Sequence, residues 1–206
     1  HLSSLSPEAY VTRSPGLRSP HRVGPGRGLD KWFFSPGFEP GTGGLLREPG
    51  LMDARRRFDG RAWLDSRGLA ARPGERVVSL FCYASAPVSD LLQTLADAPT
   101  LLLLTPGTAN AAPCPPMLRC VELPWLSQPD YDRLLWACDC NFVRGEDSFL
   151  RGQWALRPMV WQPYPQAEAL HLHKLEAFLR RYGQGLPEGT AHALGDFWRA
   201  WSRGVG

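Results

Sequence analysis

Residues 140–161, CNFVRGEDSFLRGQWALRPMVW, decide the fold because they hold a complete strand, a helix and a second strand. The run Cys140 to Val143 has the length and apolar character of a buried strand, and Asp147 to Ala155 has the period of a helix. The run Pro158 to Trp161 is again of strand length. Short apolar strands that alternate with helices are typical of a parallel sheet, since parallel neighbours need a crossover connection.

The same alternation extends on both sides of this unit. Three more strands are predicted at Arg76 to Tyr83, Thr100 to Thr105 and Met117 to Glu122. Further helices are predicted at Val88 to Asp97, Pro129 to Cys138, Glu168 to Tyr182 and Thr190 to Trp201. The fold class that this pattern predicts is α/β, with a Rossmann-like parallel sheet that carries helices on both faces.

The first 65 residues differ from the rest of the chain. Residues 3–50 are rich in proline and glycine without sustained periodicity, which predicts mostly loop, and a helix is predicted at Leu51 to Leu64. We therefore divide the chain into a loop-rich segment, residues 1–65, and a Rossmann-like domain with a C-terminal helix, residues 66–206. Because the chain starts at His1 without a methionine, we expect it to be an N-terminally truncated form.

Composition and charge argue against several classes of partner. The 206 residues are 43% hydrophobic and 21% charged, which is close to the average of globular proteins. The net charge of +3 is small and the basic residues are scattered, so we expect no nucleic-acid partner. The longest apolar stretch, around Leu101 to Leu104, is far shorter than the ~20 residues that cross a bilayer, so we expect no membrane span.

The cysteines and histidines predict neither a disulfide framework nor a metal site. Cysteines at positions 82, 114, 120, 138 and 140 are odd in number and contain no CxxC pair, and a reducing cytoplasm is the simplest explanation. His171 and His173 lie two residues apart on a predicted helix, so their side chains point to different sides. We assign no metal.

The end of the Cys140 strand offers the clearest candidate site. Ligands in open α/β sheets bind beyond the carboxyl ends of the strands, and a helix N-terminus attracts phosphate. Here Gly145 lets a ligand approach the backbone, Ser148 adds a hydroxyl, and Arg144 can donate two hydrogen bonds to phosphate. Glu146 or Asp147 can accept from a sugar hydroxyl. Ordinary helix capping by the Asp and Ser side chains is the alternative.

Two other strand ends contribute candidate residues to the same edge of the sheet. Phe81 and Tyr83 are two residues apart at the end of a strand, and their rings can stack on a nucleobase or pack on a neighbouring helix. The segment after the strand Met117 to Glu122 carries Tyr131 and also Gln128, whose amide can bind a base edge.

Several of these residues fall in longer runs that resemble one family. The run Tyr131 to Arg151, YDRLLWACDCNFVRGEDSFLR, is continued by QWALRPMVWQPYPQ and HLHKLEAFLRRY. Upstream, KWFFSPGFEPGTGGLLREPGL and VSLFCY follow in the same order. Together they resemble the bacterial arginine rhamnosyltransferases that modify translation elongation factor P. The resemblance covers nearly the whole chain.

The resemblance implies the C-terminal half of an inverting GT-B glycosyltransferase. Such an enzyme transfers L-rhamnose from dTDP-β-L-rhamnose, its donor substrate, to an arginine of elongation factor P, a post-translational modification of a cytoplasmic protein, without a cofactor or metal. The residues that the resemblance places in the donor site are Phe81, Tyr83, Gln128, Tyr131, Arg144, Glu146, Asp147 and Ser148, with Glu146 also the one catalytic candidate.

The resemblance also implies what this chain lacks. The family's general base is an aspartate of the N-terminal domain, and no stretch of the chain matches that domain, so we expect the chain alone to bind the nucleotide sugar without transferring it. Two alternatives stay open: another GT-B transferase with a different nucleotide sugar or acceptor, and a non-catalytic nucleotide-binding remnant.

Overall fold

The fold was analysed in a computed structural model that describes residues 5, 12–13, 16–108, 113–166 and 169–204. The chain forms two compact units. The larger unit comprises Glu48–Pro165 and Gly185–Gly206, and the smaller one comprises His1–Arg47 and Gln166–Gln184. The boundary that the sequence predicts between residues 65 and 66 stays a prediction.

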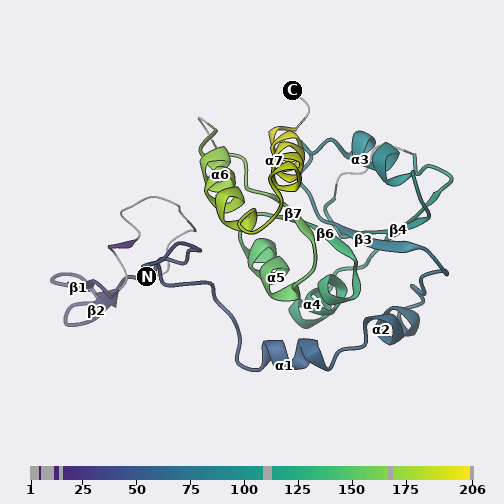
Figure 1. The fold of residues 1–206 in the computed structure, drawn as a ribbon. Helices are drawn as coiled ribbons and strands as arrows, with labels where there is room; N and C mark the ends of the chain where they lie inside the picture. The colour runs from purple at the N-terminus through teal and green to yellow at the C-terminus, as the bar shows by residue number, and fades with distance from the viewer. Residues whose placement is uncertain (1–4, 6–11, 14–15, 109–112, 167–168, 205–206) are drawn as a thin grey trace. The chain divides into compact units, whose positions relative to one another are not determined.

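A five-stranded parallel sheet forms the centre of the larger unit (Figure 1). Its strands, in chain order, are β3 (Arg76–Leu80), β4 (Thr100–Leu104), β5 (Leu118–Glu122), β6 (Cys140–Arg144) and β7 (Met159–Gln162). In space they are arranged β5-β4-β3-β6-β7. The chain therefore builds outward from β3 in one direction and then returns to continue from its other side. This reversal places the topological switch point, where such folds bind ligands, between β3 and β6.

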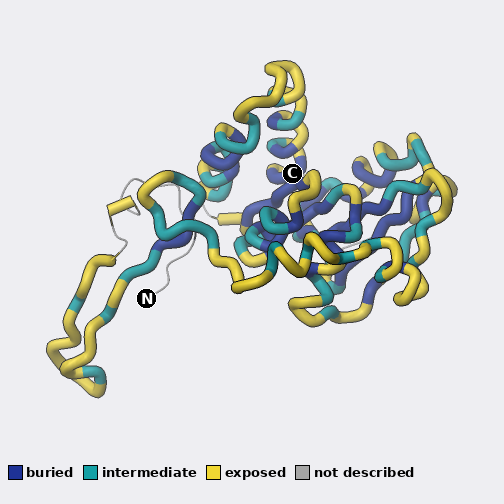
Figure 2. Tube along the Cα trace, turned by 60° about the horizontal axis from the view of Figure 1, so that its bottom comes forward, coloured by how far each residue is buried: buried dark blue, intermediate teal, exposed yellow. Residues whose placement is uncertain are grey.

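Helices cover both faces of this sheet, which confirms the predicted α/β Rossmann-like class. Figure 1 shows α3 (Val88–Leu95) and α7 (Glu188–Arg203) on one side and α4 (Gln128–Ala137) and α5 (Asp147–Ala155) on the other. Leu101 and Leu103 pack with Leu134 of α4, whereas the Phe142 ring lies 4.9 Å from that of Trp201 in α7. Because both faces are covered, all five residues of β4 are buried (Figure 2).

The helix predicted at Leu51 to Leu64 is wrong, because the chain forms two short helices there. They are α1 (Leu51–Arg56) and α2 (Gly60–Ser66). The Asp59 carboxylate accepts a hydrogen bond from Ala62 N at 3.0 Å and so begins a new helix. Gly60 allows close contact with α4, since a Cβ at this position would lie 2.9 Å from the Cα of Ala137.

The expectation that the cysteines form no disulfide is also wrong. Cys114 and Cys120 are joined by a disulfide across a Cα–Cα distance of 6.3 Å. The odd number of cysteines and the absence of CxxC gave no sign of this pair, because a bond across the start of β5 depends on how the preceding loop folds back. Cys82, Cys138 and Cys140 are free thiols.

Among its described residues, the smaller unit contains two short strands and one helix. Strands β1 (Arg18–Pro20) and β2 (Asp30–Trp32) pair antiparallel and are largely exposed (Figure 2). Helix α6 (Leu170–Tyr182) begins two residues after Glu168, where the sequence predicts its start and which lies outside the described residues. Phe178 of α6 contacts Phe38, with ring centroids 5.3 Å apart. No helix in the described part of the chain is long and apolar enough to span a membrane.

A buried arginine joins α4 to α5 within the larger unit. The Arg151 side chain is 8% exposed, and its Nε donates to Asp132 Oδ1 at 2.5 Å while its second amino group forms an ion pair with the same carboxylate. Its remaining amino group lies 2.6 Å from a carboxylate oxygen of Glu48, whose side chain is 58% exposed. Asp132 is therefore the partner that neutralises this arginine away from water.

We predict that Asp132→Asn lowers the free energy of unfolding by about 3 kcal/mol, because it leaves a buried guanidinium without its closest anion. Urea unfolding followed by circular dichroism measures the change. The matched control is Glu48→Gln, which removes an exposed partner of the same arginine and should cost less than about 1 kcal/mol. Equal losses of unfolding free energy in the two variants would contradict the conclusion that Asp132, and not Glu48, is the main partner of Arg151.

Candidate functional site

The site begins where β3 and β6 separate. The last backbone hydrogen bond between them runs from Phe81 N to Phe142 O at 3.0 Å. Beyond this point the Arg144 side chain connects the two strand ends. One of its amino groups donates hydrogen bonds to Cys82 O at 2.8 Å and to Gly107 O at 3.2 Å. One guanidinium therefore connects the ends of β6 and β3 with the loop after β4.

Two aromatic rings flank the same guanidinium. Its central carbon lies 3.9 Å from the centroid of the Phe81 ring and 4.8 Å from that of Tyr83. The cation is attracted to the electron-rich ring faces, which favours this position of the side chain. The rings of Tyr83 and Tyr164 pack edge to face, with centroids 5.6 Å apart.

The turn after β6 leads directly into the N-terminus of α5. Gly145 has a φ of +64°, a value that favours glycine. The Ser148 hydroxyl accepts from Arg144 N at 2.9 Å and also bonds to Arg144 O, so it holds the turn. Glu146 is the N-cap residue of α5, and its side chain makes no capping hydrogen bond. Ser148 thus has a local structural role at the turn, but it is not the helix-capping role that was the alternative to ligand binding.

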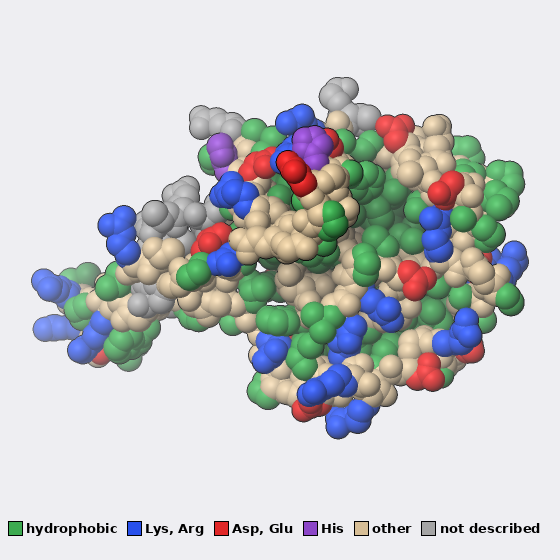
Figure 3. All heavy atoms as spheres, viewed as in Figure 1, with side chains coloured by type: hydrophobic (Ala, Val, Ile, Leu, Met, Phe, Trp, Pro, Cys, Tyr) green, Lys and Arg blue, Asp and Glu red, His purple; other side chains and the backbone are tan. Residues whose placement is uncertain are grey.

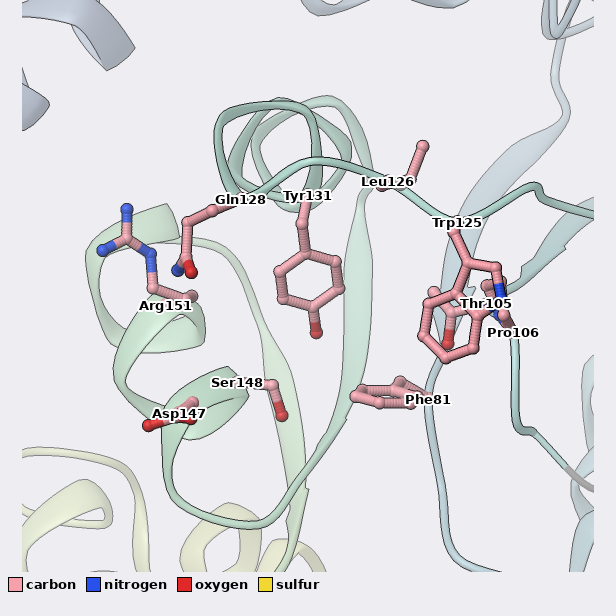
Figure 4. Close-up of a pocket in the computed structure, with 10 residues that line it drawn as sticks. All are labelled: Phe81, Thr105, Pro106, Trp125, Leu126, Gln128, Tyr131, Asp147, Ser148 and Arg151. Atoms are coloured by element: carbon pink, nitrogen blue, oxygen red, sulfur yellow. The ribbon is translucent and has the colours of Figure 1, made fainter.

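A pocket of about 230 Å³ opens beside this turn, between α4, α5 and the ends of β3 and β4 (Figure 4). Ligand pockets usually measure about 300 to 1,000 Å³, so this one has room for part of a nucleotide sugar. The predicted site residues that line it are Phe81, Gln128, Tyr131, Asp147 and Ser148. The pocket is not lined by Tyr83, Arg144 or Glu146. The Arg144 guanidinium nevertheless contacts Phe81, which lines the pocket, and it also contacts the Tyr83 ring.

The pocket also has lining residues that the sequence analysis did not select. Trp125, whose surface is 83% exposed, stands at its rim, and Arg151 contributes to its wall from α5. A tryptophan three residues after a predicted strand is a signal that sequence inspection can find. The position of Arg151 depends on how α4 and α5 pack, so no local pattern indicates it. A larger cavity of about 520 Å³ lies between α1 and α4 and shares Gln128 and Arg151 with this pocket.

Burial raises the pKa of several hydrogen-bonding groups of the site further above neutrality. It raises the pKa of the Cys82 thiol to about 12, although the nearby Arg144 cation works in the opposite direction. Burial likewise raises the pKa of the Tyr83 and Tyr131 hydroxyls. These three groups are therefore neutral near pH 7 and are unsuited to act as bases there.

Charge on the larger unit is mixed, and no cluster that suits a metal occurs among its described residues. On the face shown in Figure 3, Lys and Arg side chains of the larger unit lie among Asp and Glu side chains instead of forming a stripe. The described residues contain no group of three or more His, Cys, Asp or Glu side chains that could hold a metal ion. His171 accepts a hydrogen bond at Nδ1 from Gln166 N at 3.2 Å.

Comparison with known proteins gives consistent matches. A family model described as "Elongation-Factor P (EF-P) rhamnosyltransferase EarP" matches residues 1–205. A protein-arginine rhamnosyltransferase of Pseudomonas aeruginosa is 46% identical over 100% of this chain and 60% of its own length. The protein of that name from Pseudomonas putida is 42% identical over 98% of this chain and 58% of its own length.

A solved structure supports the same relationship. It is described as "Structural basis for EarP-mediated arginine glycosylation of translation elongation factor EF-P" and is 39% identical, with a TM-score of 0.70. The match covers 81% of this chain and 59% of the solved chain. The chain thus spans about 60% of the length of the relatives that it matches.

The turn at Gly145 gives a first test of the site's geometry. We predict that Gly145→Ala lowers the free energy of unfolding by about 1 to 2 kcal/mol, since φ is positive there and the new Cβ would lie 2.8 Å from the Tyr83 hydroxyl. The control, Gly189→Ala, adds a methyl group to α7 with nothing within 4 Å and should leave stability unchanged or slightly higher. Chemical denaturation measures the free energy of unfolding of both variants. A Gly145→Ala variant as stable as the parent chain would contradict the described turn.

Proposed function

Since this chain belongs to the family of elongation factor P rhamnosyltransferases, we propose that it forms the donor site of an inverting glycosyltransferase. The proposed reaction moves L-rhamnose from dTDP-β-L-rhamnose to an arginine side chain of bacterial translation elongation factor P. In this proposal residues 66–206 correspond to the donor-binding domain of a GT-B enzyme, and the protein works in the cytoplasm, where its acceptor takes part in translation.

The observation that carries the proposal is the position of Arg144 at the switch point. Its guanidinium lies close to the Phe81 and Tyr83 rings, and its backbone leads through Gly145 into the N-terminus of α5. A helix N-terminus and an arginine both favour bound phosphate, and aromatic rings favour a base. A nucleoside diphosphate needs these two kinds of surface side by side.

The pocket suggests how the donor is divided between these surfaces. We place the thymine in the 230 Å³ pocket, where Phe81, Trp125 and Tyr131 supply rings and Gln128 supplies an amide. The diphosphate then lies over the Arg144–Gly145 turn and the first residues of α5. Glu146 and Asp147, at the start of α5, are assigned to hydroxyls of the sugar, and Asp147 also lines the wall of the pocket.

The proposed chemistry is a single displacement at the anomeric carbon. The bond to the acceptor nitrogen forms on one face as the bond to the diphosphate oxygen breaks on the other, which inverts the configuration. Arg144 and the α5 backbone amides stabilise the charge that develops on the diphosphate, without a metal. The arginine nitrogen of the acceptor must lose a proton, and the resemblance assigns this step to an aspartate of the N-terminal domain, which no stretch of this chain matches. Within this chain Glu146 stays the one catalytic candidate.

We predict that this chain binds dTDP at least about tenfold more tightly than UDP or GDP, which corresponds to about 1.4 kcal/mol. The expected cause is that the apolar lining of the pocket favours the 5-methyl group of thymine, which uracil lacks, while its small volume disfavours a purine. Isothermal titration calorimetry with the three nucleotides measures the order. If UDP bound as tightly as dTDP, the donor would be a different nucleotide sugar. If none of the three nucleotides bound, the proposal that this chain holds the donor site would be wrong.

Replacing the arginine should separate its role from that of an ordinary surface cation. We predict that Arg144→Ala weakens dTDP binding by about 1.5 to 3 kcal/mol, or roughly ten- to a hundredfold, through loss of a charge-assisted contact to phosphate. The matched control is Arg76→Ala at the opposite end of β3, where the arginine donates to Leu95 O and contacts Asp97. That variant should bind dTDP like the parent chain. Unchanged affinity in Arg144→Ala would make this arginine purely structural.

A further inference from the structure

Strand β7 ends in a fully buried glutamine whose side chain reaches beyond the neighbouring strand. Gln162 is 0% exposed. Its Oε1 accepts a hydrogen bond from Tyr83 N at 2.8 Å, and its Nε2 donates to Ser85 Oγ at 3.3 Å. Tyr83 and Ser85 follow β3, which is separated from β7 by β6 in the sheet. The amide therefore ties the loop after β3 to a strand that does not pair with it.

The same end of β7 also fixes the turn after β6. Gly145 N donates to the backbone oxygen of Gln162 at 2.9 Å. Gly145 O accepts from the indole Nε1 of Trp161 at 2.6 Å, and Trp161 is itself 0% exposed. Both backbone groups of Gly145 are thus bound by two consecutive residues of β7.

These contacts make Gln162 the common support of two parts of the site. Through its side chain it holds the backbone that carries Tyr83, and through its main chain it holds the Arg144–Gly145 turn. Gln162 therefore helps to set the distance between the Tyr83 ring and this turn. A glutamine suits this role because its amide supplies an acceptor and a donor at the end of a long side chain.

We propose that Gln162 is a positioning residue for the donor diphosphate, which it acts on through Tyr83 and the Arg144–Gly145 turn. The inference rests on the proposed donor function of the site. Loss of the Gln162 amide leaves Tyr83 N without its buried acceptor, so the loop after β3 shifts relative to the turn. Contacts to phosphate should weaken, whereas the pocket proposed for the base, which Gln162 does not line, should keep its shape.

The test compares two ligands that share a base and differ in phosphate. The full 206-residue chain and its Gln162→Met variant are titrated with dTDP by calorimetry and with thymidine by competition against dTDP. The affinity of the variant for dTDP should fall about tenfold, the effect of losing one well-formed hydrogen bond and its alignment, while that for thymidine should change less than about twofold. Gln162→Asn, which keeps an amide but is one methylene shorter, should show the same pattern and serves if the methionine variant does not fold.

A matched control removes a buried amide from the neighbouring strand. Asn141 of β6 is also 0% exposed and bonds to Ser79 Oγ at 2.6 Å and Leu135 O at 3.0 Å. Asn141→Ala should lower stability in urea while leaving the ratio of dTDP to thymidine affinity as in the parent chain. A parent-like ratio in both Gln162 variants, or the same change of ratio in Asn141→Ala, would overturn the inference. A parent chain that binds neither ligand would instead contradict the proposed donor function.

Discussion

The separation of β3 from β6 after Phe81 is the constraint on which the site depends. Up to this point the backbone groups of the two strands satisfy one another, and beyond it Cys82 O and Tyr83 N need other partners because buried polar groups are costly to leave unbonded. Side chains provide them: the guanidinium of Arg144 for the carbonyl and the amide of Gln162 for the N–H. The gap at the switch point is thus lined by fixed polar side chains.

This arrangement means that Arg144 is held before any ligand arrives. An arginine free in solvent has many rotamers, and holding it in one of them on binding costs conformational entropy. Here Cys82 O, Gly107 O and the ring of Phe81 restrict it in advance. Such preorganisation is what a site for a diphosphate leaving group requires, because the cation then needs little rearrangement as charge develops on the phosphate.

The sequence predicted those helices and strands that are determined by residues within the same segment. The helix Asp147–Ala155 has the predicted bounds because its period and its start after an Arg-Gly pair both lie within the segment. The break between α1 and α2 has a local cause, the Asp59 cap, which the sequence analysis overlooked, and a tertiary one, the packing of Gly60 against Ala137. The Cys114–Cys120 disulfide was also missed, since cysteine spacing carries no information about how a loop returns to its strand.

The site also contains residues that the sequence predicted and residues that it did not. The register of β6 and β7 explains this difference. Arg144 stood out in the sequence because it ends a strand before a glycine, whereas Gln162 matters only because the sheet pairs it with Arg144. Paired residues on adjacent strands project to the same face, and a shift of one residue moves every side chain to the other face. Such a shift would bring Trp161, whose indole only donates, or Pro163, which has no side-chain acceptor, to the place of Gln162. Neither could accept from Tyr83 N, so the geometry of the site is fixed by strand register as much as by residue type.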